Sequence, residues 1–184
     1  MISPTILVLA GGIGSGKTTI SRALAERFGW NQVNCGSVIR AKALRVGLPS
    51  NDRHVLQDLV LEWVKRDVTE FSKAILEAGC WQAGQSLLVD GVRNRAVVEG
   101  LRQLTSPSIT AVVYLEACIG TRRGRVRVRN EAEDLSHGEA HAVEIEATTL
   151  REIAALIVDA EGSTVRAVDE IAQWLRNAEE KTPV

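Results

Sequence analysis

The residues with the clearest chemistry lie near the N-terminus, where Gly11 to Thr18 fit the pattern G-x-x-x-x-G-K-[ST]. Glycines in such a loop let main-chain N–H groups approach a phosphate, and the helix that follows adds the positive end of its dipole. We expect Lys17 to reach the β- and γ-phosphates of a nucleotide and the Thr18 hydroxyl to ligate Mg²⁺. The predicted phosphate-binding residues are Gly11, Gly12, Ile13, Gly14, Ser15, Gly16, Lys17, Thr18 and Thr19.

A second candidate is Asp90, which ends the apolar run Ser86-Leu87-Leu88-Val89 and precedes Gly91. In a chain with a phosphate loop, an aspartate at the end of a strand holds Mg²⁺ directly or through water. The alternative is an ordinary aspartate in a turn. We therefore predict a magnesium site made by Thr18 and Asp90, with Lys17 and Asp90 as catalytic residues.

A third feature is a dense run of charge. Five arginines fall within eight residues, at Arg122, Arg123, Arg125, Arg127 and Arg129, and an acidic stretch follows. Such a run is usually a solvated helix face with pairs at i,i+4. His137 and His141 inside the stretch have a spacing that suits a metal on a helix, but Gly138 between them disfavours that interpretation.

The elements that must position these residues alternate between strand and helix. Apolar runs predict strands at 6–10, 86–91 and 109–115, with a weaker one at 31–35, and amphipathic spacing predicts helices between them. The helix expected over 52–78 has a possible break near 67–69, and Ser50 or Asn51 could cap its start. Residues 155–159 fit either a short buried strand or the end of a helix.

This alternation predicts an α/β fold of three layers, with a five-stranded parallel sheet between helices. Ligands in such sheets bind at the carboxyl ends of the strands. The phosphate loop, Cys35-Gly36, Asp90-Gly91 and the segment after Leu115 would gather at that edge.

Composition limits the remaining classes. The 184 residues suffice for a single domain over 1–184, and the net charge of −1 provides no basic field for nucleic acid. The widely spaced Cys35, Cys80 and Cys118 are most simply reduced thiols of a cytoplasmic protein. No basic flank precedes an apolar signal core, and no apolar run is long enough to span a membrane. We expect a monomer or a homodimer.

Three segments together resemble the nucleoside monophosphate kinase family of P-loop proteins, which includes adenylate kinase and its relatives. The phosphate loop is also similar to that of dephospho-coenzyme A kinase. Asn34-Cys35-Gly36-Ser37-Val38-Ile39-Arg40 resembles the adenylate kinase segment of Gly-Asp, two apolar residues and Arg, and Leu88-Val89-Asp90-Gly91-Val92-Arg93 resembles Asp-Gly-Phe-Pro-Arg. The chain departs from the pattern at Ser37, at the missing proline before Arg93, and at Asn34-Cys35, where dephospho-coenzyme A kinase has Asp-x-Asp.

The resemblance implies roles for residues outside the phosphate loop. Arg40 and Arg93 would bind the phosphate of the acceptor, with Gly36 and Ser37 beside them. A lid of about residues 122–141 would close over ATP, and Arg127 and Arg129 are our choices for its arginines.

The expected activity is that of an ATP-dependent phosphotransferase. With ATP and Mg²⁺ as cofactors, it would move the γ-phosphate of ATP to a nucleotide or nucleotide-like small molecule. The alternatives are a kinase of another small metabolite, such as dephospho-coenzyme A, and a nucleotide-binding regulatory protein without turnover. The absence of an Asn-Lys-x-Asp segment disfavours a GTPase, and the length disfavours an AAA-type motor.

Overall fold

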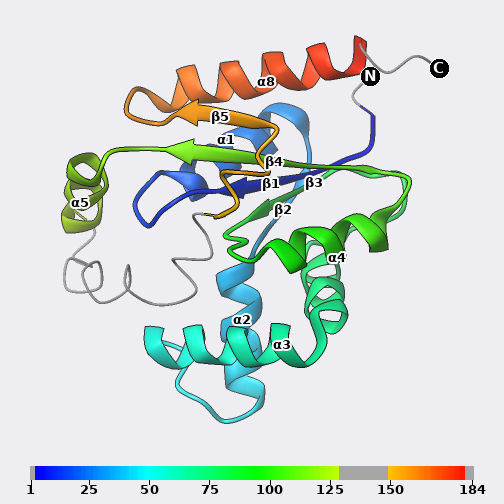
Figure 1. Ribbon diagram of the computed structural model, residues 1–184, viewed down its shortest axis with the longest axis vertical. Coiled ribbons are helices and arrows are strands. Elements are labelled where there is room, and N and C mark those ends of the chain that lie inside the picture. Colours follow the sequence, from blue (N-terminus) through cyan, green and yellow to red (C-terminus); the bar gives the residue numbers. More distant parts are fainter. Residues whose placement is uncertain (1–2, 129–148, 181–184) are drawn as a thin grey trace.

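The computed structural model describes residues 3–128 and 149–180. Its strands form one sheet in the order β2-β3-β1-β4-β5, and all neighbouring strands are parallel (Figure 1). The strands are β1 Thr5–Ala10, β2 Asn31–Asn34, β3 Leu87–Asp90, β4 Ile109–Glu116 and β5 Leu156–Asp159. The helices are α1 Lys17–Phe28, α2 Cys35–Arg45, α3 Arg53–Ala78, α4 Arg95–Thr105, α5 Ile119–Val128 and α8 Thr164–Glu180.

The alternation of side chains along β1 builds the two faces of the sheet. Ile6 and Val8 belong to the core that contains buried residues of α3 and α4, whereas Leu7 and Leu9 belong to the core that contains those of α1 and α8. Each of these four side chains is fully buried, as expected for the central strand of a parallel sheet. The predicted α/β architecture of three layers with a five-stranded parallel sheet is confirmed.

Helix α3 bends sharply, as its sequence predicts. Asp67 has φ −157° and ψ 91°, which interrupts the helix, and its carboxylate accepts the backbone N–H of Glu70 at 2.8 Å. The two halves of α3 therefore point in different directions, and the first half lies beside α2, away from the sheet (Figure 1). The predicted cap at Ser50 or Asn51 is wrong, because the Asp52 carboxylate accepts the first free N–H groups of the helix.

The ambiguous segment near residue 157 is a strand. Val113 pairs with Leu156 in a parallel register, and the N–H of Ala155 donates to the carbonyl of Val112 at 2.8 Å. The alternative that helix continues to this point is wrong, because pairing with β4 satisfies the backbone along the edge of the sheet. The weakly predicted strand β2 is confirmed, with Val33 opposite Val89.

The predicted lid is described only in part. Residues 122–128 belong to α5, whereas Arg129, His137 and His141 lie outside the described residues. Within the described part of the chain, no helix is both long and apolar enough to cross a bilayer.

Candidate active site

The phosphate loop joins β1 to α1 at the carboxyl edge of the sheet. Gly14 has φ +78°, and a Cβ there would lie 2.6 Å from the carbonyl oxygen of Arg122, so both backbone conformation and space require glycine. Gly16, with φ +93°, precedes the first residue of α1. The loop thus delivers the start of a helix, with its unpaired N–H groups, to the edge where ligands bind.

Lys17 is folded back onto this loop. Its ammonium donates to the carbonyls of Gly11 and Gly12, at 2.7 Å each. Burial and, to a smaller extent, the nearby charge of Arg93 lower the pKa of Lys17 to about 7, although the charge of Asp90 opposes them. Loop carbonyls therefore stabilise the lysine charge only in part, and a phosphate in the loop would supply the anion that it lacks.

Asp90, at the end of β3, accepts two side-chain hydrogen bonds on the same oxygen. The Thr18 hydroxyl donates to Oδ2 at 2.7 Å, and Asn34 Nδ2 donates to it at 2.9 Å. Asp90 is 1% exposed, so these partners hold its carboxylate at a fixed place beside the loop. The structure brings Thr18 and Asp90 together, as the sequence predicts.

Magnesium fits this pair of oxygen ligands. Among the described residues, no three His, Cys, Asp or Glu side chains are grouped as a metal site of their own. Mg²⁺ is usually bound in proteins by one or two carboxylates, with phosphate oxygens of the substrate and water completing its octahedron. Thr18 and Asp90 can therefore hold the ion when a nucleotide phosphate lies in the loop.

A cavity of about 740 Å³ extends from the phosphate loop to α2, α3 and the segment after β3. Besides Lys17, the described residues of its lining include Arg40, Arg53 and Arg93, and Asp90 is the one carboxylate among them. Burial, together with the nearby charge of Arg53, lowers the pKa of Arg93 to about 10. Such a cationic cavity favours an anionic ligand.

The first turn of α2 shapes one side of the cavity. The Asn34 side chain caps α2 by accepting the N–H of Ser37 at 3.2 Å, and a Cβ on Gly36 would lie 3.2 Å from Arg40 Nη1. Glycine at this position therefore leaves room for the Arg40 guanidinium. Gly36, Arg40 and Arg93, three of the predicted acceptor-binding residues, line the cavity, whereas Ser37 contributes its backbone N–H to the cap and has an exposed side chain.

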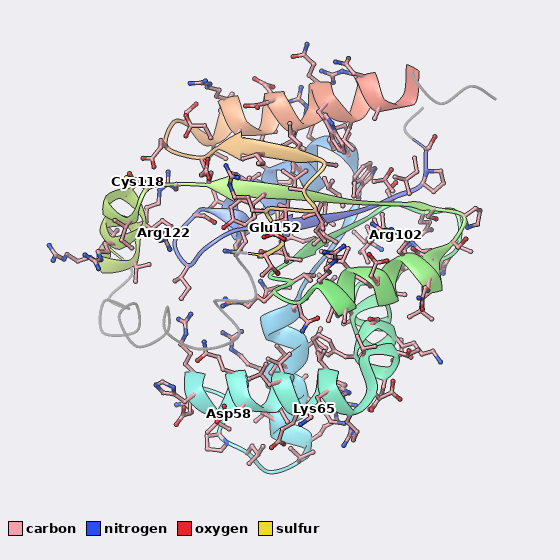
Figure 2. All side chains as sticks on the ribbon, viewed as in Figure 1. Asp58, Lys65, Arg102, Cys118, Arg122 and Glu152 are labelled. Atoms are coloured by element: carbon pink, nitrogen blue, oxygen red, sulfur yellow. The ribbon has the colours of Figure 1, made fainter. Side chains whose placement is uncertain are left out.

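Two arginines of α5 contact the phosphate loop. Arg122 donates to the carbonyl of Ile13 at 3.4 Å, and Arg125 donates to the carbonyls of Ser15 at 3.3 Å and Ala160 at 2.7 Å. Figure 2 shows Arg122 on α5, close to where β4 ends. Within the described part of the chain these are the α5 arginines that contact the loop; the Arg127 side chain is exposed.

A second cavity, of about 290 Å³, lies on the other side of the loop. Arg125 forms part of it, with the remaining lining supplied by α1, the segment after β5 and the start of α8, at Ser15, Gly16, Thr19, Ile20, Val128, Ala160, Gly162, Ser163, Thr164 and Ala167. Thr19 thus faces this cavity, whereas Lys17 and Thr18 face the larger one. The loop therefore lies between two cavities.

Sequence reasoning missed several of these residues. Arg53, Asn34, Arg122 and Arg125 all contribute to the site, and none was among the predicted site residues. The arginine run carries no local signal that separates Arg122 and Arg125 from its other members, because Arg123 and Arg127 also share a helix face at i,i+4. No local signal marks Arg53 either.

The chain matches the family model AAA_17, described as an AAA domain, over residues 10–142. It is 31% identical over 124 residues to a cytidylate kinase of Symbiobacterium thermophilum, which is 66% of this chain and 48% of that protein. The chain thus spans about half the length of the curated relatives it matches. Its fold is similar to shikimate kinase from Aquifex aeolicus, with TM-score 0.56, 18% identity and coverage of 96% and 99%. A gluconokinase from Sinorhizobium meliloti has the same TM-score and identity, with 98% of both chains covered.

Proposed function

This chain belongs to the P-loop family described as an AAA domain and is similar to kinases, and on that premise we propose that it is an ATP-dependent phosphotransferase. The acceptor that we propose is a small molecule carrying a phosphate, in the class of nucleotides. One observation carries the proposal: the cavity that begins at Lys17, Thr18 and Asp90 continues without interruption to Arg40 and Arg93. Donor and acceptor can therefore meet in one cavity.

The donor side is proposed to bind the triphosphate of ATP. The loop N–H groups and Lys17 would hold phosphate oxygens, and the smaller cavity beside Thr19 would take the nucleoside. Mg²⁺ held by Thr18 and Asp90 would supply positive charge to the phosphates. Arg122 and Arg125 already contact the loop, so they can add hydrogen bonds to the same phosphates with little movement.

The acceptor side is proposed to bind a phosphate through arginines. Two like-charged phosphates repel each other strongly at short range unless cations lie between or beside them. Arg40, Arg53 and Arg93 provide planar groups, each able to form two charge-assisted hydrogen bonds with one phosphate. Their contribution to the reaction would be positioning and neutralisation of charge, which is most of what phosphoryl transfer requires.

Two further parts of the proposal concern the cellular compartment and the lid. Cys35, Cys80 and Cys118 are free thiols in the structure, which is consistent with a cytoplasmic protein. Arg127, near the end of α5, and Arg129, just after it, are proposed as lid arginines that approach the donor when the lid closes over the loop. Both statements remain predictions.

A kinase of an uncharged or carboxylate-bearing metabolite is the second candidate. The fold is shared with enzymes named for shikimate and gluconate, which favours this candidate over a regulatory protein. Three arginines in the acceptor region favour a phosphate over a single carboxylate, because each guanidinium can pair with two oxygens.

The test is acceptor-dependent release of ADP. The purified protein is incubated with ATP and Mg²⁺ and, in turn, with each nucleoside monophosphate, dephospho-coenzyme A, shikimate and gluconate, and products are identified by mass spectrometry. We expect at least one phosphorylated acceptor to raise ADP release well above the rate with ATP alone. The folded Lys17→Ala variant is the control and should not respond. Tight ATP binding without stimulation by any acceptor would indicate a regulatory protein and overturn the proposal.

A further inference from the structure

Helix α3 contributes the wall of the larger cavity that is farthest from the sheet. Its first half, which carries Asp58 and Lys65 in Figure 2, ends at the kink at Asp67. Of the residues on this half, six line the cavity: Arg53, Leu56, Gln57, Val60, Leu61 and Val64. Their spacing of three and four residues places them on one face of the helix. That face is cationic at its start and apolar along its length, except at Gln57.

Gln57 is buried without the hydrogen bonds that its side chain can make. The residue is 6% exposed, and neither Oε1 nor Nε2 has a partner among the described residues. A buried amide that pairs with nothing lowers the stability of a folded protein, and such groups are rare enough to need an explanation. A leucine at this position would extend the apolar face and avoid the cost. The position of Gln57 in the lining of the acceptor region suggests a functional reason for the amide.

We propose that Gln57 recognises the polar edge of a planar heterocycle on the acceptor, an inference that rests on the proposed phosphotransferase function. The amide presents an oxygen that accepts and an N–H group that donates, side by side. Its partner is therefore an edge that presents a donor next to an acceptor, as a nucleobase does. Both amide atoms are shielded from water in the described structure, so the proposed contact requires the flexible side chain to turn toward the ligand.

The neighbours of Gln57 favour a flat ring over a polyol. Leu56, Val60 and Val64 on the same helix line the cavity and offer apolar surface to the faces of a heterocycle, and Phe71 and Val97 belong to the same lining. A polyol would bring several hydroxyl groups against these side chains, and each would lose its hydrogen bonds to water. One amide in an apolar wall suits a ligand whose polar atoms are confined to its edge.

The distance along α3 fits a nucleotide as well. Arg53 precedes Gln57 by four residues, which is about 6 Å of helix rise. An acceptor whose phosphate reaches Arg53 and Arg93 can therefore place a heterocycle near Gln57, with the sugar between them. The same face of one helix would then contact both ends of the acceptor.

The test combines stability with acceptor preference in the Gln57→Leu variant. Because the substitution removes an unsatisfied amide, we expect the variant without ligand to be at least as resistant to thermal unfolding as the wild type. We also expect the ratio of kcat/KM for the best nucleoside monophosphate to that for ribose 5-phosphate, which lacks the base, to fall at least about tenfold. The value of kcat/KM for the nucleotide should fall, whereas that for ribose 5-phosphate should stay nearly unchanged. Gln103→Leu, an exposed glutamine of α4, is the matched control and should alter neither quantity.

Two results would overturn the inference. A marked loss of thermal stability in Gln57→Leu would give the amide a structural role. An unchanged preference for the nucleotide over ribose 5-phosphate would remove it from recognition. If the wild type transfers phosphate to no acceptor, the proposed function fails, but Gln57 can still be tested by calorimetry with AMP, GMP, CMP and UMP. The Gln57→Leu variant must then lose affinity for the monophosphate that binds best to the wild type. If its affinity is unchanged, the inference about Gln57 fails too.

Discussion

The lysine of the phosphate loop should take up a proton when the nucleotide binds. Burial and the charge of Arg93 hold the pKa of Lys17 at about 7, so above that pH most molecules without ligand carry a neutral amine. A bound triphosphate favours the charged form, because an anion next to an ammonium raises its pKa. Binding at alkaline pH therefore includes protonation of Lys17.

The size of the effect follows from the pKa of about 7. The fraction of neutral amine is roughly 0.1 at pH 6, 0.5 at pH 7 and 0.9 at pH 8, so the number of protons taken up per nucleotide rises along the same series. The association constant must respond by linkage. Above pH 8 it should fall by almost tenfold per pH unit, until the pKa of Lys17 in the complex is reached.

Titration calorimetry measures the uptake directly. The enthalpy of binding of magnesium and a non-hydrolysable ATP analogue is compared at pH 8 in two buffers that differ in ionisation enthalpy. The nucleotide is fully ionised at that pH, so its own protons contribute little. Lys17→Arg is the control, because a guanidinium keeps its charge throughout this range and should show almost no uptake.

The same reasoning fixes how stability depends on pH. The pKa of Lys17 is lowered on folding from 10.5 to about 7, so between these values the unfolded chain binds a proton that the folded chain does not. The free energy of unfolding, relative to the Lys17→Met variant, should therefore rise as the pH increases through this window, by at most about 5 kcal/mol. Proton uptake near zero in the wild type at pH 8, or equal uptake in Lys17→Arg, would refute the reasoning.

Three other substitutions test separate parts of the site. Arg93→Ala should lower kcat/KM for the acceptor by at least about tenfold, from the loss of about 1.5–3 kcal/mol of charged hydrogen bonding. Its affinity for ATP should stay near that of the exposed control Arg95→Ala. An equal loss of ATP affinity would place Arg93 on the donor side. Asn34→Ala removes a donor to Asp90, so calorimetry should show weaker binding of the nucleotide in the presence of Mg²⁺ and little change in its absence. An equal loss of affinity with and without Mg²⁺ would argue against a role of Asn34 in positioning Asp90. Asp67→Ala removes the carboxylate that caps the second half of α3, and should lower the free energy of unfolding in urea by about 0.5–2 kcal/mol. An unchanged midpoint of urea unfolding would mean that the cap contributes nothing to stability.

The phosphate loop and the contact between Thr18 and Asp90 were predictable because their signals are local. One stretch of sequence carries the strand, the glycines and the start of the helix, and the carboxyl ends of parallel strands necessarily share one edge. Asp90 could therefore be placed beside Thr18 from its position at the end of a strand, and the structure joins them at 2.7 Å.

The remaining site residues depend on contacts between distant segments. Arg53 reaches the cavity because α3 bends at Asp67 and its first half runs beside α2, a geometry that no local pattern specifies. Arg122 and Arg125 contact the phosphate loop because of the way in which α5 packs against it, whereas Arg127 is exposed. The composition of the arginine run does not reveal this difference. Even the cap of α3 required the backbone angles, because three successive polar residues could each have started the helix.

The charges in the larger cavity bear on the choice between a kinase and a protein that only binds nucleotide. Among the described residues, four cationic side chains and one carboxylate line it, and both Lys17 and Arg93 have pKa values lowered partly by neighbouring positive groups. ATP with Mg²⁺ in the loop would lie nearest to Lys17, whereas Arg53 and Arg93 lie close enough to each other for the charge of Arg53 to lower the pKa of Arg93. A second ligand with a phosphate would add negative charge beside these arginines, and its phosphate would then lie next to the phosphate to be transferred. A phosphorylated acceptor would therefore account for the arginines at the far end of the cavity, as the proposed transfer requires.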